Sequence, residues 1–98
     1  MLFVLLGYAK SDSTTKARIA RRAQWQYDPD VRVVAEYWLL GDPVLVLVLE
    51  ADNVGAIMRG VAEWDDHFDM TVVPAVTAEQ GLQAAGAMLQ GVPASLAT

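Results

Sequence analysis

The sequence predicts an α+β domain in which two helices cover one face of a four-stranded antiparallel sheet. Residues 44–49 are six consecutive apolar residues, half of them β-branched, directly after Pro43. A strand points successive side chains to opposite faces, so a strand without polar alternation should be covered on both sides. Strand-like and helical segments follow one another in the order β-α-β-β-α-β, and 98 residues make a single small domain.

The composition is more apolar than that of an ordinary small domain. The chain is 54% hydrophobic and 19% charged. A small domain has much surface for its volume, and a subunit interface is the natural cover for excess apolar surface. No run approaches the roughly 20 apolar residues of a membrane-spanning helix. Residues 1–6 are apolar without a preceding basic segment, which predicts a first strand rather than a signal peptide, and hence a cytoplasmic protein.

Charge and residue types exclude several classes of function. A net charge of −5 argues against a nucleic-acid partner. The absence of cysteine excludes disulfides, thiolate nucleophiles and cysteine-based zinc sites. The sequence has no glycine-rich phosphate loop, no Gly-x-Ser-x-Gly elbow and no recognisable serine–histidine pattern. We therefore expect neither a cofactor nor a metal.

The first half of the chain predicts a strand, a helix and a hairpin. Residues 2–9 form the first strand, and the helix-capping residue types at 11–13 predict a helix over 14–26. The apolar face of this helix comprises Ala17, Ile19, Ala20 and Ala23. A second strand over 31–40 then pairs with residues 44–49 through a turn at 41–43.

Regular alternation divides the second strand into two faces. One face carries Val31, Val33, Ala35, Tyr37 and Leu39, and the other carries Arg32, Val34, Glu36, Trp38 and Leu40. One of the two neighbouring aromatic residues should therefore face the helices and the other the open side of the sheet.

The second half predicts another helix, an edge strand and a terminal helix. Asp52 or Asn53 caps the second helix. Its buried stripe comprises Val54, Ile57, Met58 and Val61, continued by Phe68. The strand over 69–76 contains Pro74, which cannot donate a ladder hydrogen bond and belongs at an edge. A capping box at 77–80 opens a third helix that reaches about residue 90, and residues 91–98 are expected to form a flexible tail.

This order of elements is the ferredoxin-like split βαβ pattern with an extra C-terminal helix. Right-handed crossovers place both main helices on one face of the sheet, with the first and third strands in the centre. The other face remains apolar. We therefore expect one domain over residues 1–90 that pairs with a second copy through this face.

Three short elements resemble a known family. They are residues 47–52 (Leu-Val-Leu-Glu-Ala-Asp), 64–66 (Trp-Asp-Asp) and 72–76 (Val-Val-Pro-Ala-Val). In this order they resemble a short bacterial family, known only as a domain of unknown function, within the dimeric α+β barrel superfamily. The resemblance covers roughly residues 1–77 and implies a homodimer with a cleft between each sheet and its helices. The superfamily includes cofactor-free monooxygenases, isomerases, cyclases and small ligand binders, and the family supplies no catalytic residue.

Two residues are candidates for proton transfer. His67 is the only histidine, and Asp65, Asp66 or Asp69 could orient it as a general acid or base. The alternative is a histidine that caps the C-terminal end of a helix. Glu36 lies beside an indole on a half-buried strand, where a carboxylate can line a pocket. The alternative for Glu36 is an edge strand with one solvated face.

Other residues are candidates for ligand contact. Tyr37, Trp38, Trp64 and Trp25 could line the sheet–helix cleft, although aromatic residues more often belong to the core. Arg18, Arg21 and Arg22 could hold an anionic ligand, although a solvated helix face is the more common role. The acidic cluster around His67 could also hold a metal, but its spacing matches no calcium loop.

Two functions follow from this reading. The first is a homodimer that binds an apolar or aromatic small molecule in the sheet–helix cleft, with cofactor-independent isomerisation, cyclisation or oxygenation as the chemistry if it is an enzyme. The second is a non-catalytic homodimer that serves assembly or regulation. An open cavity would favour the first function, and a filled core would favour the second.

Overall fold

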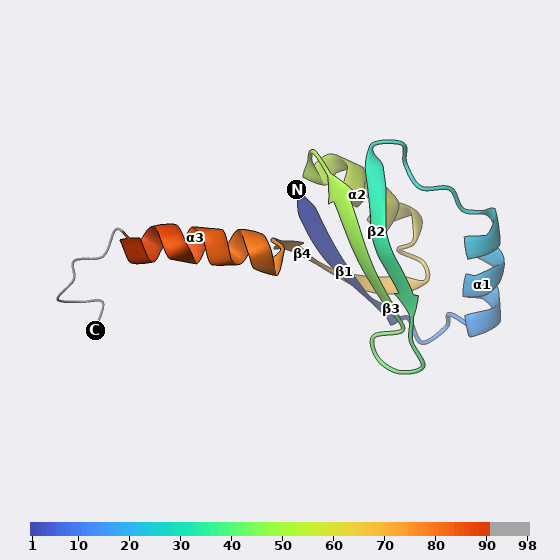
Figure 1. Cartoon of the computed structure of the whole chain (residues 1–98). Helices are drawn as coiled ribbons and strands as arrows, with labels where there is room; N and C mark the ends of the chain where they lie inside the picture. Colours follow the sequence, from blue (N-terminus) through green and yellow to red (C-terminus); the bar gives the residue numbers. More distant parts are fainter. Residues whose placement is uncertain (91–98) are drawn as a thin grey trace.

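The computed structural model describes residues 1–90, and the predicted α+β fold is confirmed (Figure 1). The elements are β1 (Leu2–Ala9), α1 (Thr15–Gln24), β2 (Val31–Trp38), β3 (Leu45–Ala51), α2 (Val54–Glu63), β4 (Phe68–Ala75) and α3 (Ala78–Gln90). The four strands form one antiparallel sheet in the order β2-β3-β1-β4, which is the ferredoxin-like arrangement. The predicted tail at 91–98 lies outside the described residues.

The two central strands, β1 and β3, supply most of the core. Burial alternates along both strands, and one side of each is buried against the helices. The helix-facing core comprises Phe3, Leu5, Leu45, Leu47, Leu49, Ala51, Ala56, Ile57, Trp64 and Phe68. Pro74 lies on the edge strand β4, as its missing donor requires.

Helix α2 is packed directly on the sheet. The Asn53 side chain caps its first turn by accepting a hydrogen bond from the Ala56 backbone N–H at 3.1 Å. Ala56 and Ile57 are buried. The predicted stripe was wrong at Val54 and Met58, which are exposed, because the small Ala56 faces the sheet in their place and brings the helix backbone close to β3.

Helix α1 is turned differently from the prediction. Thr14 caps it by accepting from the Ala17 N–H, and none of its ten residues is buried. Ala17, Ala20 and Ala23 are exposed, so the predicted inward face was wrong at these positions, although Ile19 does lie toward the sheet. The helix instead turns its arginines toward the body of the protein. Their guanidinium groups reach aromatic rings and polar partners that alanine side chains are too short to contact.

A β-bulge in β2 reverses the predicted faces after Val33. The pairing with β3 runs regularly from Val31 to Val33 and then shifts at Val34. As a result Arg32 lies on the open face, whereas Glu36 pairs opposite Leu47 on the helix-facing side. The prediction that Glu36 and Arg32 share a face was therefore wrong.

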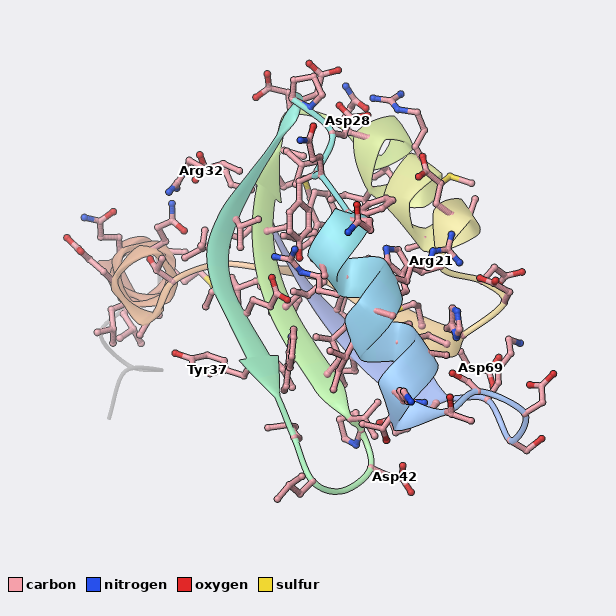
Figure 2. The ribbon with its side chains drawn as sticks, turned by 90° about the vertical axis from the view of Figure 1, so that its right-hand side faces the viewer. Arg21, Asp28, Arg32, Tyr37, Asp42 and Asp69 are labelled. Atoms are coloured by element: carbon pink, nitrogen blue, oxygen red, sulfur yellow. The ribbon has the colours of Figure 1, made fainter. Side chains whose placement is uncertain are left out.

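The bulge also decides which of the two strand aromatics faces the helices. Trp38 pairs opposite Leu45 and faces the helix layer. Tyr37 pairs opposite Val46 and lies on the open face, where Figure 2 shows it, together with Arg32, on the side of β2 away from α1.

The open face of the sheet is largely apolar, and no element of the described chain covers it. Its centre is formed by Val4, Leu6, Ala35, Val46, Val48 and Val73. Helix α3 leaves the body after β4 and projects away from it (Figure 1). Its capping box is confirmed: the Thr77 and Gln80 side chains each bond the other residue's backbone N–H at 3.0 Å.

Helix α3 exposes its apolar side chains. Leu82 and Met88 are each 73% exposed. Among residues 1–90, no helix is both long enough and apolar enough to cross a membrane.

Candidate functional site

A cleft of about 530 Å³ lies between α1 and the helix-facing side of the sheet. This space is the α1 cleft. Its floor is the apolar surface of the central strands, with Leu5, Leu47 and Leu49 among its residues. Its roof is the inward face of α1, from Thr15 to Arg22. Figure 2 shows α1 standing in front of the sheet with side chains between the two layers. The volume lies within the roughly 300–1,000 Å³ typical of small-molecule sites.

Aromatic side chains form one wall of the α1 cleft. Trp25, directly after α1, packs edge-on against Trp64 at 5.6 Å and against Tyr27 at 6.2 Å between ring centroids. Trp64 also contacts Phe68 at 5.6 Å. Trp38 lines the opposite end and is 57% exposed, which places it near the mouth. These rings offer flat apolar contact to a bound molecule.

The Glu36 carboxylate is the centre of a polar cluster in this largely apolar cleft. Arg22 reaches it with two donors, Nε to Oε2 at 2.9 Å and Nη2 to Oε1 at 3.0 Å. The Tyr27 hydroxyl donates to Oε1 at 2.9 Å, and Trp38 Nε1 donates to Oε2 at 2.8 Å. Four donors thus converge on one carboxylate whose side chain is 16% exposed. A bidentate arginine pair of this kind fixes both partners firmly.

These contacts determine the charge state of the cluster. Burial alone would raise the pKa of Glu36, but the hydrogen bonds from Arg22, Trp38 and Tyr27 outweigh it and hold that pKa below its ordinary value. Burial raises the pKa of the Tyr27 phenol, and the hydrogen bond to Glu36 raises it further. The cluster is therefore a fixed carboxylate–guanidinium pair with a neutral phenol. Such a carboxylate is a poor acceptor for a substrate proton, since protonation breaks favourable contacts.

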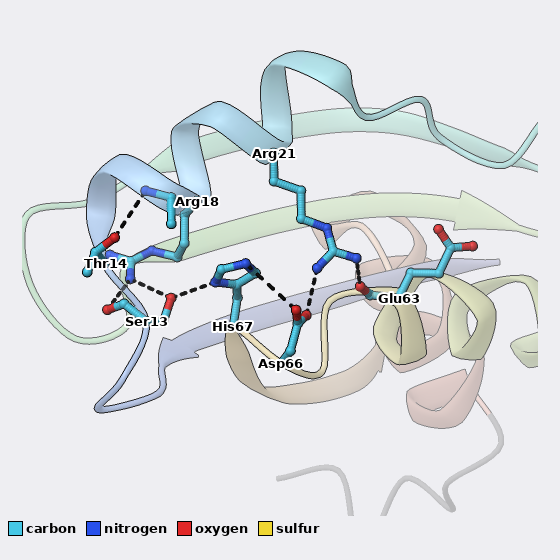
Figure 3. A network of polar contacts seen from close by, with 8 residues as sticks. Ser13, Thr14, Arg18, Arg21, Glu63, Asp66 and His67 are labelled. Atoms are coloured by element: carbon cyan, nitrogen blue, oxygen red, sulfur yellow. Dashed lines mark hydrogen bonds and ion pairs between the residues drawn. The ribbon is translucent and has the colours of Figure 1, made fainter.

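A second polar cluster lies at the N-terminal end of α1 (Figure 3). Arg18 Nη1 donates to Ser13 Oγ at 3.0 Å, and Ser13 Oγ lies 2.8 Å from His67 Nδ1. Because arginine can only donate, the serine oxygen accepts from it, and the serine proton is available to the histidine. His67 Nε2 lies 3.9 Å from Asp66 Oδ2, which is too long for a hydrogen bond. The serine–histidine contact was missed in the sequence because its partners are 54 positions apart.

Two of the acidic residues around His67, Asp66 and Asp69, are engaged by basic side chains. Arg21 donates to Asp66 Oδ1 at 2.6 Å and also to the backbone carbonyl of Glu63, and its guanidinium lies 4.9 Å from the Trp64 ring centroid. Lys10 reaches Asp69 Oδ1 at 2.9 Å. Asp66 and Asp69 each serve a separate ion pair, so these two carboxylates do not converge on a shared metal site.

The structure brings five of the predicted site residues together and separates two. Glu36, Trp38, Trp25, Trp64 and Arg18 all line the α1 cleft. Tyr37 lies on the opposite face because of the bulge, so its expected place in the cleft is corrected. His67 is not among the cleft-lining residues and does not meet Glu36.

Tyr27 and Arg22 complete the Glu36 cluster; Arg22 was considered from the sequence only as a contact for an anionic ligand, and Tyr27 was not chosen as a site residue. Tyr27 lies between the end of α1 at Gln24 and the turn at 28–30. Arg22 was grouped with the helix arginines as a solvated face. The i, i+4 spacing of Arg18 and Arg22 puts both on one side of α1, but it does not reveal that Arg22 meets Glu36, which lies 14 positions away.

Comparison with protein families finds one match. Residues 1–89 match the family described as "Domain of unknown function (DUF3303)". Neither the curated proteins nor the solved structures yield a match to this chain.

Proposed function

The chain belongs to the DUF3303 family, and we propose that it binds an apolar or aromatic small molecule in the α1 cleft. The observation that supports this proposal is the separation of α1 from the sheet. Helix α1 buries none of its residues, yet a cleft of about 530 Å³ with apolar and aromatic walls lies beneath it. A module built only for assembly would gain stability by closing this space with apolar side chains.

The proposal concerns binding and leaves Glu36 in a structural role. Both of its oxygens are already bonded, and it would have to release Arg22, Tyr27 or Trp38 before accepting a proton. Isomerisation, cyclisation or oxygenation therefore requires the bound molecule to rearrange this cluster or to use His67 from beyond the cleft.

Two neighbouring aromatic residues provide a matched test. A neutral fluorescent dye such as Nile red is titrated with the full chain, with Trp38→Ala and with Tyr37→Ala. Trp38 and Tyr37 are similarly exposed, at 57% and 61%, but only Trp38 lines the cleft. We expect Trp38→Ala to weaken dye binding several-fold and Tyr37→Ala to leave it within two-fold. Equal effects of the two substitutions, or no binding to the full chain, would refute the α1 cleft as a binding site.

We also propose that the chain forms a homodimer through the open face of its sheet. This face is apolar at its centre, and no described element covers it. An antiparallel sheet that leaves one apolar face uncovered is unusual in a monomer. If dimerisation occurs without any dye binding, the assembly function becomes the better explanation.

A charge in the centre of the open face tests the dimer. Native mass spectrometry should give twice the chain mass of 10.6 kDa for the unmodified protein. We expect Val48→Asp to shift the population to monomer, because a carboxylate would be buried without a partner. The control is Ala20→Asp on the exposed side of α1, which should stay dimeric. A monomeric unmodified protein would disprove this interface.

A further inference from the structure

The five arginines of the chain differ in whether they are paired with a carboxylate. Four of them form ion pairs: Arg21 with Asp66, Arg22 with Glu36, Arg32 with Glu50, and Arg59 with Asp28 and Asp30. Arg18 has no acidic partner within 4.0 Å among the residues that the structure describes. It nevertheless lies on the wall of the α1 cleft. The cleft therefore holds one guanidinium whose charge no carboxylate of residues 1–90 neutralises by direct contact.

The edge of the guanidinium that Arg18 leaves open is the one that binds carboxylates elsewhere in this molecule. Arg22, Arg32 and Arg59 each use Nε together with Nη2 to reach acidic oxygens. Arg18 uses Nη1 for the Ser13 carbonyl and hydroxyl, at 3.1 and 3.0 Å. Nη2 has only the Thr15 hydroxyl at 3.2 Å, and Nε has no hydrogen-bond partner in the described part of the chain.

The surroundings of Arg18 hold this edge in place. The bonds to Ser13 anchor one side of the guanidinium, and its carbon lies 5.9 Å from the centroid of the Phe68 ring, another cleft residue. The Thr15 hydroxyl is also part of the cleft wall. A carboxylate that meets the Nε–Nη2 edge would make two parallel charge-assisted hydrogen bonds, which is the preferred geometry of this pair.

We propose that the ligand of the α1 cleft is a carboxylic acid with an apolar body, whose carboxylate binds Arg18 while its body rests on the aromatic wall and the leucine floor. This inference rests on the proposed function and specifies the ligand class. An aromatic acid and an aliphatic acid share this chemistry. Of the three carboxylates that line the cleft, Glu36 is paired with Arg22 and Asp28 with Arg59, and Asp42 forms no ion pair with Arg18, so none of them occupies the Arg18 guanidinium.

The test compares acids with neutral alcohols of the same shape. Displacement of Nile red is measured with 2-naphthoate, 2-naphthalenemethanol, octanoate and octanol, on the full chain and on Arg18→Gln. We expect the full chain to bind each acid at least about ten-fold more tightly than the alcohol of the same shape. Arg18→Gln should weaken the binding of acids roughly ten- to hundred-fold. The tighter of the two acids identifies an aromatic or an aliphatic body. Alcohol binding should remain within two-fold, which also shows that the variant keeps its cleft.

Two further variants separate the roles of charge and geometry. Lys16→Gln removes one positive charge from the exposed surface of the same helix and should leave acid binding unchanged. Arg18→Lys keeps the charge but loses the two-donor edge, and its affinity for acids should fall between those of the full chain and Arg18→Gln. Acids that bind no better than alcohols, or an Arg18→Gln variant that binds acids normally, would refute the ligand class and leave the binding function intact. If neither the dye nor any of the four compounds binds, both the ligand class and the binding function are refuted.

Discussion

The two helices that cover the sheet are held in opposite ways. Helix α2 lies directly on the strands through the buried side chains of Ala56 and Ile57. Helix α1 buries no residue and is linked to the body by arginine contacts, with Arg22 on Glu36 and Arg21 on Asp66. Both helices have ten residues and cover the same face of the sheet. Their difference is therefore a difference in side-chain length and chemistry.

This difference explains where a ligand site can exist in so small a domain. Alanine and isoleucine bring a helix close and exclude space, whereas long arginine side chains hold a helix at a distance through their ends. The space beneath α1 stays open because the ion pairs at its margins carry the contact. Helix α2 thus contributes to stability through its packing on the sheet, whereas α1, held by its arginines, leaves space for a ligand.

The largest expected difference between the two helices is in stability. Ile57→Ala should lower the free energy of unfolding by about 2–5 kcal/mol because it leaves a cavity in the packed core. Ile19→Ala on α1 should lower it by about 1 kcal/mol at most, since Ile19 is already 48% exposed. Urea titration at one fixed protein concentration measures both. Equal losses would mean that α1 packs on the sheet as α2 does.

A smaller effect is expected from the ion pair that holds α1. Glu36→Gln should cost roughly 1–3 kcal/mol at neutral pH, since it removes the charged acceptor of four hydrogen bonds. The pKa of Glu36 in the folded protein lies below its ordinary value. The ionised carboxylate therefore adds fully to the free energy of unfolding at a pH above the ordinary carboxyl pKa. This stabilisation is lost as the pH falls through the pKa of the folded protein. The stability difference between the two proteins should therefore narrow in acid.

The matched control for Glu36→Gln removes the same charge from an exposed residue. Glu79→Gln in the first turn of α3 should give no comparable loss at neutral pH and no narrowing in acid. A constant difference between the unmodified protein and Glu36→Gln from neutral pH to acid would contradict the assigned charge state of Glu36.

The smallest expected difference between the two helices is in the exchange rates of their backbone amides. Backbone amides of α1 should exchange with deuterium faster than those of α2, because fewer buried apolar contacts hold α1 in place. A saturating cleft ligand should slow exchange in α1 and leave α2 nearly unchanged. Hydrogen-exchange mass spectrometry resolves the two helices, and identical protection of both would remove the distinction between them.

The fold could be predicted from local patterns that agree with one another. The apolar run at 44–49 indicated the central strand, Pro74 indicated an edge, and the Thr77–Gln80 spacing indicated a capping box. Each of these signals depends on neighbouring residues only. The face of α1 could not be predicted in this way, because its alanines resemble a buried stripe while its arginines have partners distant in sequence.

The candidate site was predicted in part. Glu36, Trp38, Trp25, Trp64 and Arg18 were named and share the cleft. The bulge at Val34 was invisible because neither glycine nor proline marks it, so the sequence could not decide which of Tyr37 and Trp38 faces the helices. The contact of Ser13 with His67 follows from the pairing of Ala9 with Phe68, which aligns the end of β1 with the start of β4.

The bulge means that strand β2 has two possible ways of pairing with the same neighbour. Without the bulge, the carboxylate of Glu36 would emerge among apolar side chains on the open face, far from Arg22 and Tyr27. The bulge interrupts the regular pairing of β2 with β3 at Val34. In return, Glu36 gains the ion pair and the hydrogen bonds of the cluster, which stabilise the bulged register. The contacts of Glu36 therefore stabilise the register of the edge strand β2. The same carboxylate that shapes the cleft also determines which aromatic residue, Trp38 or Tyr37, each face of the sheet receives.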